Sequence, residues 1–409
     1  MKSFVQFGAG NIGRSFLGQL FSRAGYAVIF IDVNPALIAA LNRHREYRVV
    51  IKSAAEETIT VRNVAGILGT DREAVAAALS TCDLAGTSVG KGALPYLMAP
   101  IAAGLMRRDP ARPLDIIIAE NIHDGADLFR RGLAPLLPPG FDLAGRVGLV
   151  ETSIGKMVPI MKAGDIAADP LWVFAEPYNT LILDRRGFKN PVPAVPGLDA
   201  KENIKAFVDR KLYIHNLGHA AAAYIGHVRR PGTSFLWEVL TDPVTLVLAR
   251  GAMTEARDAL LALYPAEFTA AVLDAHIADL LARFQNRHLS DTVFRVGRDL
   301  KRKLARDDRL TGGLLLCARL GLPSARIALA TGAGFAFHAT DEQGRPDPAD
   351  AAVHAAIARD GLRPAVAAFT GLAPGVAAEA ALLDTVVRHA EAVRTRGAEY
   401  LAEKAGASL

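Results

Sequence analysis

Apolar and polar positions in the first part of the chain follow the pattern of strands and helices that succeed one another. Residues 3–8 form a short apolar run that ends in glycine, and over residues 12–24 the apolar positions recur at the spacing of a helix. Residues 26–33 are β-branched and aromatic, which predicts a second strand. Asn34 and Pro35 then suit the N-cap and the first position of a second helix. The opening therefore predicts two successive strand–helix units.

The same alternation continues to about residue 153. The further strands that it predicts are residues 60–68, 82–89, 114–121 and 146–153, and the helices between them include residues 71–80 and 96–108. Strands that alternate with helices form a parallel sheet with helices packed on its faces. The fold class predicted for this part is α/β, as a Rossmann-like domain with a parallel sheet.

The pattern changes after residue 153. Residues 172–198 contain short extended pieces and prolines, which are typical of β structure followed by a connecting segment. From residue 200 to about residue 402 the apolar positions keep a helical spacing. We therefore predict a Rossmann-type domain with a β extension at residues 1–198 and a mainly α-helical substrate and catalytic domain at residues 199–409.

Composition places the chain among ordinary globular proteins. Hydrophobic residues make up 51% of the 409 residues and charged residues 22%. No run of 18 uncharged apolar residues appears, so we expect no membrane-spanning helix and no membrane partner. The N-terminus lacks the pattern of a secretory signal, and Cys82 and Cys317 lie far apart in apolar surroundings. These features predict a cytoplasmic protein with buried thiols.

The formal net charge of +5 is spread along the chain, with basic clusters at residues 107–112, 227–231 and 298–309. Aromatic residues do not interleave with these clusters, and no nucleic-acid reader motif is visible. We therefore expect no nucleic-acid partner. A small anionic substrate and a pyrophosphate fit the charge better.

The sequence Gly8-Ala9-Gly10-Asn11-Ile12-Gly13 is a G-x-G-x-x-G motif between a predicted strand and a predicted helix. This context separates a dinucleotide-binding turn from a chance group of glycines. Gly8 permits the tight turn, Gly10 lets the backbone approach the pyrophosphate, and Gly13 permits close packing of helix on strand. The pyrophosphate would lie at the helix N-terminus, so Asn11 and Ile12 belong to the predicted cofactor site.

Asp32 ends the second predicted strand, about 20 residues after the motif, where an acidic residue accepts hydrogen bonds from the adenosine ribose. Its carboxylate would repel a 2′-phosphate, so NAD is favoured over NADP as the cofactor. The alternative is that Asp32 only stabilises the start of the following helix.

A second motif lies in the helical half of the chain. Lys211, Asn216 and His219 fall within an arc of about 140° if this segment is an α-helix with about 100° per residue. Oxidation of an alcohol needs a base for the hydroxyl proton and neutral donors for the developing alkoxide. Lysine acts as that base only if burial or nearby cations lower its pKa to roughly 7 or 8. On spacing alone, an amphipathic helix with ordinary polar residues is the simpler interpretation.

Nearly the full length of the chain resembles the polyol-specific long-chain dehydrogenases, also called the mannitol dehydrogenase family. The matching segments, in the family's order, are FGAGNIGRSFLG at 7–18, AEN at 119–121, FKNPVPAVPGL at 188–198, RKLYIHNLGHAAAAYIG at 210–226 and RVGRDLKRKLARDDRL at 295–310. The K-x-x-x-x-N-x-x-H motif is the most specific of these.

The resemblance implies roles for four residues. Lys211 becomes the general base, Asn216 an amide donor to the reacting oxygen, and His219 an orienting or substrate-binding group. Asn121 matches a second amide donor, although a helix cap is the alternative for Asn121 and a packed core histidine for His219. The resemblance also implies a catalytic cleft between the two domains and a reaction that needs no metal. Consistent with the latter, the sequence has no His, Cys and Asp cluster at zinc-ligand spacing.

Arg295, Arg298 and Arg302 recur at spacings of three and four, so in one helix they would point the same way. Guanidinium groups suit a phosphate, and these residues match the family's RVGR-x-x-x-RKL pattern. We expect Arg295 and Arg298 to lie nearest to the substrate. Gly297 weakens the helix prediction, and a solvated charged face is the alternative.

Two departures from the family pattern bear on the substrate. Gly155-Lys156 stands where the family commonly carries Asp-Arg, and Lys91 stands where members acting on mannitol phosphate usually carry proline. The activity class should survive both changes, whereas the identity of the substrate is open.

The leading hypothesis is an enzyme, a monomer or homodimer, that oxidises mannitol 1-phosphate or a close polyol phosphate with NAD, reversibly, to fructose 6-phosphate. The alternative is a relative that acts on a non-phosphorylated polyol or on a hexuronate. A hypothesis from another class is a catalytically silent NAD-binding sensor, which would have no need of a lysine base.

Overall fold

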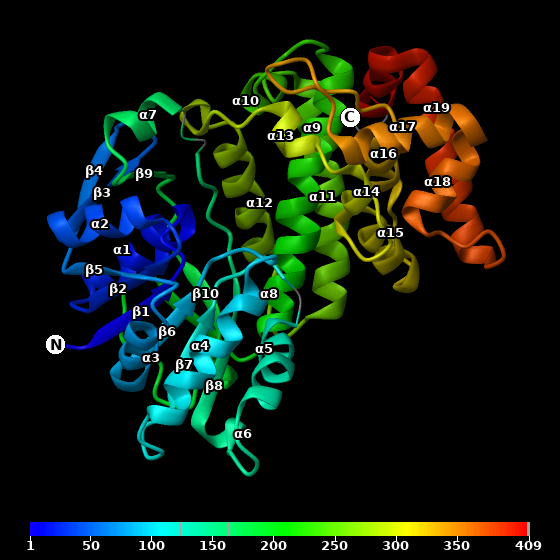
Figure 1. Cartoon of the computed structure of the whole chain (residues 1–409). Coiled ribbons are helices and arrows are strands. Elements are labelled where there is room, and N and C mark those ends of the chain that lie inside the picture. The colour runs from blue at the N-terminus through cyan, green and yellow to red at the C-terminus, as the bar shows by residue number, and fades with distance from the viewer. Residues whose placement is uncertain (123, 160, 162, 407–409) are drawn as a thin grey trace. The chain divides into compact units, whose positions relative to one another are not determined.

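The structure is a computed structural model that describes residues 1–122, 124–159, 161 and 163–406. The chain divides into two compact units, Met1–Phe207 and Val208–Leu409. The first unit contains a mostly parallel sheet and the second is mainly helical (Figure 1). The predicted fold class is therefore confirmed.

Eight strands form the main sheet, in the order β11-β10-β8-β7-β6-β1-β2-β5. Their bounds are β1 (Ser3–Phe7), β2 (Ala27–Asp32), β5 (Val64–Leu68), β6 (Leu84–Thr87), β7 (Leu114–Ile118), β8 (Val147–Ser153), β10 (Leu181–Asp184) and β11 (Leu198–Lys201). The strands from β5 to β8 are parallel, whereas β10 is antiparallel to β8. Because β2 and β6 flank β1 on opposite sides, the strand order reverses at β1, which is where doubly wound sheets bind their ligands.

A second sheet has three strands, β4 (Glu57–Arg62), β3 (Glu46–Ile51) and β9 (Trp172–Ala175). The single strand predicted at residues 60–68 is therefore wrong. Asn63 adopts a positive φ of 58°, and the chain turns there from β4 in the small sheet to β5 in the main sheet. Val61 and Val64, on either side of the turn, are buried in the same core, so the apolar pattern runs through the turn without a break.

Helices cover both faces of the main sheet. The helices of the first unit are η1 (Gly13–Gly18, a π-helical turn), α1 (Gln19–Arg23), α2 (Pro35–His44), α3 (Arg72–Thr81), α4 (Leu94–Arg107), α5 (Gly125–Leu133), α6 (Leu143–Arg146) and α7 (Ala163–Ala168), and α8 (Ile204–Arg210) contains the last residues of this unit and the first of the next. Residues of η1, α1, α2 and the small sheet form one core with Phe4, and residues of α3, α4 and α5 form another with Val5. Successive residues of a strand point to opposite faces, so β1 contributes to both cores.

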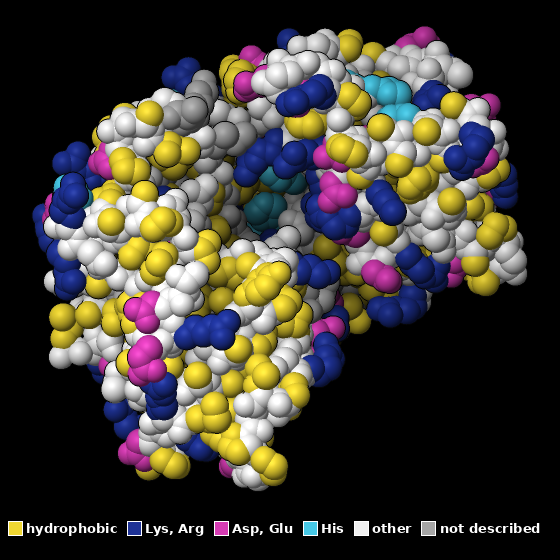
Figure 2. All heavy atoms as spheres, viewed as in Figure 1, with side chains coloured by type: hydrophobic (Ala, Val, Ile, Leu, Met, Phe, Trp, Pro, Cys, Tyr) yellow, Lys and Arg dark blue, Asp and Glu magenta, His cyan; other side chains and the backbone are white. Residues whose placement is uncertain are grey.

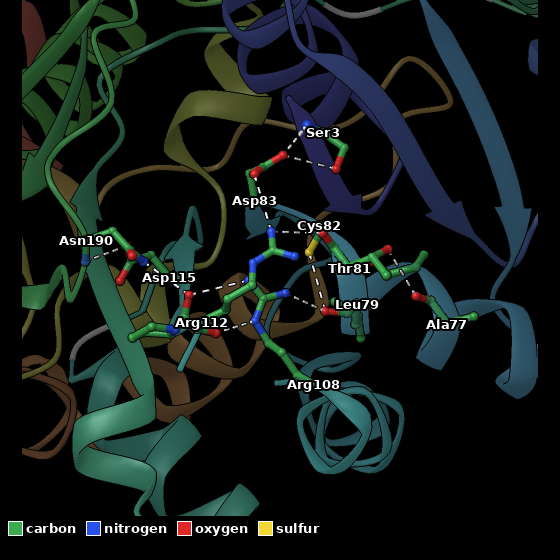
Figure 3. Close-up of polar contacts among 12 residues, drawn as sticks. Ser3, Ala77, Leu79, Thr81, Cys82, Asp83, Arg108, Arg112, Asp115 and Asn190 are labelled. Atoms are coloured by element: carbon green, nitrogen blue, oxygen red, sulfur yellow. Dashed lines mark hydrogen bonds and ion pairs between the residues drawn. The ribbon is translucent and has the colours of Figure 1, made fainter. Parts of the chain in front are cut away.

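Polar side chains connect the N-terminal ends of the strands, at the edge of the sheet opposite the glycine motif (Figure 3). The Asp83 carboxylate accepts a hydrogen bond from the backbone N–H of Ser3 at 2.7 Å, which joins the starts of β6 and β1. Arg108, 4% exposed, follows α4 and donates to three carbonyl groups, those of Leu79, Arg112 and Pro113. This network fixes how the helices α3 and α4 meet the start of β7.

The second unit consists of helices that follow one another along the chain. They are η4 (Lys211–Asn216, a π-helical turn), α9 (Leu217–Arg229), α10 (Leu236–Val239), α11 (Pro243–Leu263), α12 (Ala270–Phe284), α13 (Val293–Gly297), α14 (Leu300–Lys303), α15 (Arg309–Arg319), α16 (Ala325–Gly334), α17 (Pro348–Asp360), α18 (Leu362–Thr370) and α19 (Ala377–Gly406). Helix α19 is kinked at Gly397.

Helix α9 is the buried centre of this unit, and it lies beside α11 in Figure 1. Residues 220–225 of α9 are fully buried, and four of them are alanines. A Cβ on Gly218 would lie 2.5 Å from the Met253 sulfur of α11, so a larger residue there would require the Met253 side chain to move. The Ala-rich stretch at 220–223 is thus a packing feature, and it makes α9 a rigid support for the residues just before it.

The charged side chains are mixed in sign on the face shown in Figure 2, where Lys and Arg alternate with Asp and Glu on each unit. Part of the basic cluster at residues 107–112 is paired, because Arg107 contacts Glu73 and Arg112 contacts Asp83. Within the described part of the chain, no helix is both long enough and apolar enough to cross a bilayer.

We predict that Arg108→Met lowers the melting temperature by roughly 5 °C or more, because one buried and two partly buried hydrogen bonds to carbonyl groups are lost at about 1 kcal/mol or more each. The adjacent Arg107→Met, whose exposed side chain pairs only with exposed Glu73, is the matched control and should change the melting temperature far less. Scanning calorimetry of both variants measures this. Equal shifts would contradict a structural role for the Arg108 network.

Candidate active site

The glycine motif forms a tight turn at the point where the strand order reverses. Gly8 follows β1 with a positive φ of 90°, and a Cβ there would lie 2.5 Å from the Ser88 carbonyl oxygen that follows β6. A Cβ on Gly13 would lie 2.0 Å from the Gly8 carbonyl oxygen. Gly10 differs, since a Cβ there would meet nothing within 4 Å. Two glycines are therefore required by the protein's own packing, and the third leaves open space where a pyrophosphate would approach.

The helix after the motif is a π-helical turn over Gly13–Gly18, where the sequence predicts an ordinary helix. Asn11 is exposed and Ile12 half-buried at its start. Arg14, 7% exposed, donates from Nε to the Ala9 carbonyl at 2.7 Å and so anchors the turn from beneath. Burial lowers the pKa of this guanidinium. π-Helical turns are rare and occur often at functional sites.

Asp32 lies at the end of β2, beside the same turn. Its Oδ2 accepts a hydrogen bond from the Ala9 N–H at 2.8 Å, and its Oδ1 accepts one from the Asn34 N–H at 3.0 Å. Asn34 caps α2 as predicted, with Pro35 as the first residue. Asp32 therefore supports both the turn and the start of the next helix, and each oxygen keeps a lone pair for a ribose hydroxyl.

Asn121 lies in the loop that follows β7 and is exposed. Helix α5 begins at Gly125 with Asp124 as its N-cap residue, so Asn121 does not cap that helix. In the first unit, the residues predicted for the cofactor and Asn121 thus all follow the C-terminal ends of the strands β1, β2 and β7.

In the second unit, Lys211 and Asn216 are the first and last residues of the π-helical turn η4. The predicted α-helical arc of these side chains is therefore wrong in detail. A π turn repeats at i to i+5, and the Leu217 N–H accordingly bonds the Leu212 carbonyl. Lys211 and Asn216 are separated by five residues, so the π geometry places them one turn apart on the same side of the helix.

The environment of Lys211 disfavours its charged form. Burial, and to a smaller extent the nearby Arg309 guanidinium, lowers the pKa of the Lys211 amine to about 8. Arg309 is itself buried, where it bonds Asp308 and the Asn216 carbonyl. An amine with this pKa exists substantially in its neutral form near pH 8, which a proton acceptor requires.

His219, with a side chain 18% exposed, stacks on the Phe284 ring, the centroids 4.4 Å apart and the planes 7° from parallel. Its Nε2 lies 3.8 Å from the Asp291 Oδ2. Burial and four surrounding cations hold the pKa of the imidazole well below its usual range, so it is neutral at physiological pH; the cations are Lys303, Arg295, Arg309 and Arg283. His219 is thus a positioned, neutral hydrogen-bonding group.

The helix predicted across the three arginines is interrupted. α13 ends at Gly297 and α14 begins at Leu300, because Asp299 adopts a positive φ of 69° and a Cβ on Gly297 would lie 2.1 Å from the Phe337 ring. The three arginines therefore do not lie on one continuous helix, and the prediction that they point the same way is wrong.

The three arginines have different partners. Arg295 pairs with the buried Asp291, beside His219, and Arg302 pairs with Asp299 and Asp308. Arg298 is exposed and lies over the Phe294 ring, and in the part of the chain that the structure describes it forms no ion pair. Arg298 is therefore the arginine of this group best able to bind an anion.

Asp291, Phe284 and His215 belong to this site and were missed in the sequence. Asp291 is 8% exposed, and burial raises its pKa although Arg295 opposes the shift. His215 lies 5.9 Å from His219 between ring centroids and contacts Phe284 as well. Because Asp291 and Phe284 lie more than 60 residues beyond His219 and belong to no motif, only the tertiary structure reveals them.

The two departures from the family pattern have different surroundings. Lys156, 6% exposed, donates to the Tyr178 carbonyl at 2.7 Å and to the Asn179 side chain at 2.9 Å. The Lys156 ammonium group therefore forms hydrogen bonds within the first unit. Lys91 is exposed in the loop after β6. Among the described residues, no group of three or more His, Cys, Asp and Glu is placed to hold a metal ion.

Comparison with known families matches nearly the whole chain. The mannitol dehydrogenase Rossmann domain matches residues 2–197 and the mannitol dehydrogenase C-terminal domain matches residues 203–393. The chain is 36% identical over 337 residues to a mannitol-1-phosphate 5-dehydrogenase of Brevibacillus brevis, which covers 81% of this chain and 85% of that protein. A protein of the same name from Halalkalibacterium halodurans is 33% identical over 83% of this chain and 89% of that protein.

Two solved structures share the fold. Pseudomonas fluorescens mannitol 2-dehydrogenase, in a ternary complex with NAD and D-mannitol, has a TM-score of 0.77 at 17% identity, covering all of this chain and 95% of that one. A D-sorbitol dehydrogenase in substrate-free form has a TM-score of 0.80 at 15% identity, covering 98% and 95%. At such identities the likeness concerns the fold alone.

The glycine turn yields a paired prediction. Gly10→Ala should leave the melting temperature unchanged, because its Cβ meets no protein atom within 4 Å, yet it should weaken dinucleotide binding by filling the open space. Gly13→Ala should destabilise the protein, because its Cβ would overlap the Gly8 carbonyl. Calorimetric melting and titration with NAD measure both properties. Full NAD affinity in stable Gly10→Ala would contradict the assignment of the turn as the pyrophosphate site.

Proposed function

The chain belongs to the mannitol dehydrogenase family, and we propose that it is an NAD-dependent polyol dehydrogenase that interconverts mannitol 1-phosphate and fructose 6-phosphate without a metal. The observation that carries the proposal is the Lys211 amine, whose pKa is lowered to about 8 by burial and by the nearby Arg309 guanidinium. The relatives named mannitol-1-phosphate 5-dehydrogenase support the substrate.

The cofactor assignment depends on the turn at the reversal of strand order. Gly10 leaves room for the pyrophosphate, and the Asp32 carboxylate is placed for the adenosine ribose. A 2′-phosphate would face this carboxylate at close range, which disfavours NADP. When NAD is bound there, its nicotinamide accepts the hydride from the substrate carbon.

The remaining chemistry falls to side chains of the protein. Lys211 takes the proton of the reacting hydroxyl, and the Asn216 amide donates a hydrogen bond to the oxygen as negative charge develops on it. His219, neutral and fixed by its stacking on Phe284, orients the substrate through a hydrogen bond. By the AEN motif, we assign Asn121 as a second amide donor to the same oxygen.

The cations of the second unit suit a phosphorylated substrate. Lys303, Arg295, Arg309 and Arg283 surround His219, and Asp291 is the carboxylate that pairs with one of them. Arg298, exposed on the same segment, adds a guanidinium that is able to bind a phosphate in bidentate fashion. Arg295 and Arg302 contribute mainly to the local potential, because carboxylates already hold them.

We predict that Lys211→Ala lowers kcat for polyol phosphate oxidation by about 10² to 10⁴-fold, the usual contribution of a general base. Lys205→Ala, an exposed lysine of α8, is the matched control and should retain full activity. The assay follows reduced nicotinamide at pH 9 over a panel of polyols, polyol phosphates and hexuronates. Turnover that survives in Lys211→Ala would refute the lysine mechanism, and NAD binding without turnover of any substrate by the natural protein would favour a sensor.

The phosphate assignment has its own test. Arg298→Ala should raise KM for mannitol 1-phosphate by about 10 to 100-fold, as expected for a charge-assisted hydrogen bond, and leave KM for mannitol unchanged. Inorganic phosphate should inhibit the natural protein in competition with the substrate. A preference for free mannitol or a hexuronate, together with no inhibition by phosphate, would instead support the non-phosphorylated alternative.

A further inference from the structure

Glu120, in the AEN motif, has an unusual position for a charged residue. It follows β7 by two residues, is 6% exposed, and its carboxylate accepts two backbone hydrogen bonds from the loop after β6. Oε1 accepts from the Val89 N–H at 2.8 Å and Oε2 from the Gly90 N–H at 2.9 Å. Each carboxylate oxygen therefore holds one of two consecutive residues of a neighbouring loop.

The loop that Glu120 holds packs against the glycine turn. The Gly8 Cα lies so close to this loop that a Cβ would be 2.5 Å from the Ser88 carbonyl oxygen and 3.2 Å from a Val89 methyl group. The Gln6 side chain, fully buried, donates to Ser88 Oγ at 2.9 Å. Gly90, with a positive φ of 84°, then turns the chain outward. Movement of this loop would consequently change the wall of the dinucleotide site.

Burying the Glu120 carboxylate costs free energy. Burial raises the pKa of Glu120, although its two backbone hydrogen bonds oppose that rise. Among the described residues, no cationic side chain forms an ion pair with this carboxylate. A buried carboxylate without a cation is costly in free energy, and hydrogen bonds to it offset only part of that cost, so a role for its contacts is expected. That role is to set the geometry of the loop.

The order of strands indicates which half of the dinucleotide the loop faces. Asp32, assigned to the adenosine ribose, ends β2, and the loop held by Glu120 follows β6, on the other side of β1. A dinucleotide whose pyrophosphate lies over the glycine turn after β1 would extend from β2 toward β6. The loop therefore faces the nicotinamide half.

We propose that Glu120 is a positioning residue that holds the Ser88–Gly92 loop against the glycine turn and so shapes the pocket for the nicotinamide half of NAD. The same side chain fixes the backbone beside Asn121, the next residue in the chain, which couples the cofactor pocket to an amide donor. This inference rests on the proposed function, because it presumes that the turn binds NAD.

Asp115 provides a matched control at the other end of β7. It is 1% exposed, and its two oxygens accept hydrogen bonds from the consecutive N–H groups of Lys189 at 2.7 Å and Asn190 at 3.2 Å. Figure 3 shows it beside Asn190, on the side of the sheet where Ser3 and Asp83 join the starts of β1 and β6. Asp115 at the start of β7 and Glu120 just after its end thus each hold two consecutive backbone N–H groups, and Asp115 also accepts from the Asn190 side chain; Asp115 lies far from the dinucleotide site and Glu120 beside it.

The test compares Glu120→Gln with Asp115→Asn. An amide has one acceptor oxygen, so its NH₂ group would face a backbone N–H and one loop contact would be lost in each variant. Both variants should melt at lower temperature. Glu120→Gln alone should raise the Kd for NAD, by about tenfold, while its Kd for AMP, which lacks the nicotinamide half, should stay within twofold; Asp115→Asn should bind both ligands as the natural protein does.

Each outcome of this comparison decides a separate point. If Glu120→Gln binds NAD normally, or if Asp115→Asn weakens NAD binding equally, the positioning role is overturned. If the natural protein fails to bind NAD, the proposed function itself fails. Should Glu120→Gln not fold, Glu120→Asp keeps both acceptor oxygens on a shorter side chain, and a selective rise in the Kd for NAD over AMP is expected there too. Calorimetric titration supplies all the affinities.

Discussion

The proposed role of Lys211 depends on one physical constraint, which is that a lysine amine must lose its proton near physiological pH if it is to act as a base. The pKa of about 8 at Lys211 arises first from burial and then from Arg309. Relative to an ordinary lysine, this corresponds to roughly 3 kcal/mol against the charged form. The buried alanines of α9 and the close contact of Gly218 with α11 fix the helix from which the π turn extends. Burial and Arg309 also act on His219, where Lys303, Arg295 and Arg283 help to hold the imidazole pKa well below its usual range.

In the first unit, side chains hold the loops at the C-terminal edge of the main sheet in fixed positions. Asp32 and Glu120 each use both carboxylate oxygens to hold backbone N–H groups at the C-terminal ends of parallel strands. Arg14 holds the Ala9 carbonyl from below. Side chains thus fix the backbone of the turn and of the loop beside it. The open space at Gly10 is therefore already formed before a ligand binds.

Local sequence signals predicted the two-part fold class, whereas the three-stranded second sheet was not predicted. The strand, glycine turn and helix at the start, and the Asn34-Pro35 helix start, follow from chemistry within a few residues. The predictions that failed concern features set by contacts between residues far apart in the sequence. The turn at Asn63 lies between two valines that share one core, and the break at Asp299 follows from the contact between Gly297 and Phe337. A π turn has the same residue composition as an α turn, so the relative orientation of the Lys211 and Asn216 side chains could not be predicted from the sequence. Asp291 and Phe284 reach His219 only through the fold.

The pH dependence of kcat/KM in both directions tests the central claim about Lys211 most directly. Oxidation requires the neutral amine, so its rate should rise with pH through a single ionisation near pH 8 and then level off, whereas reduction, which returns the proton, should fall through the same pKa. Opposite slopes with a common midpoint near pH 8 are the predicted result. A midpoint above pH 10, or a profile that is flat from pH 6.5 to 9.5 in both directions, would contradict the account.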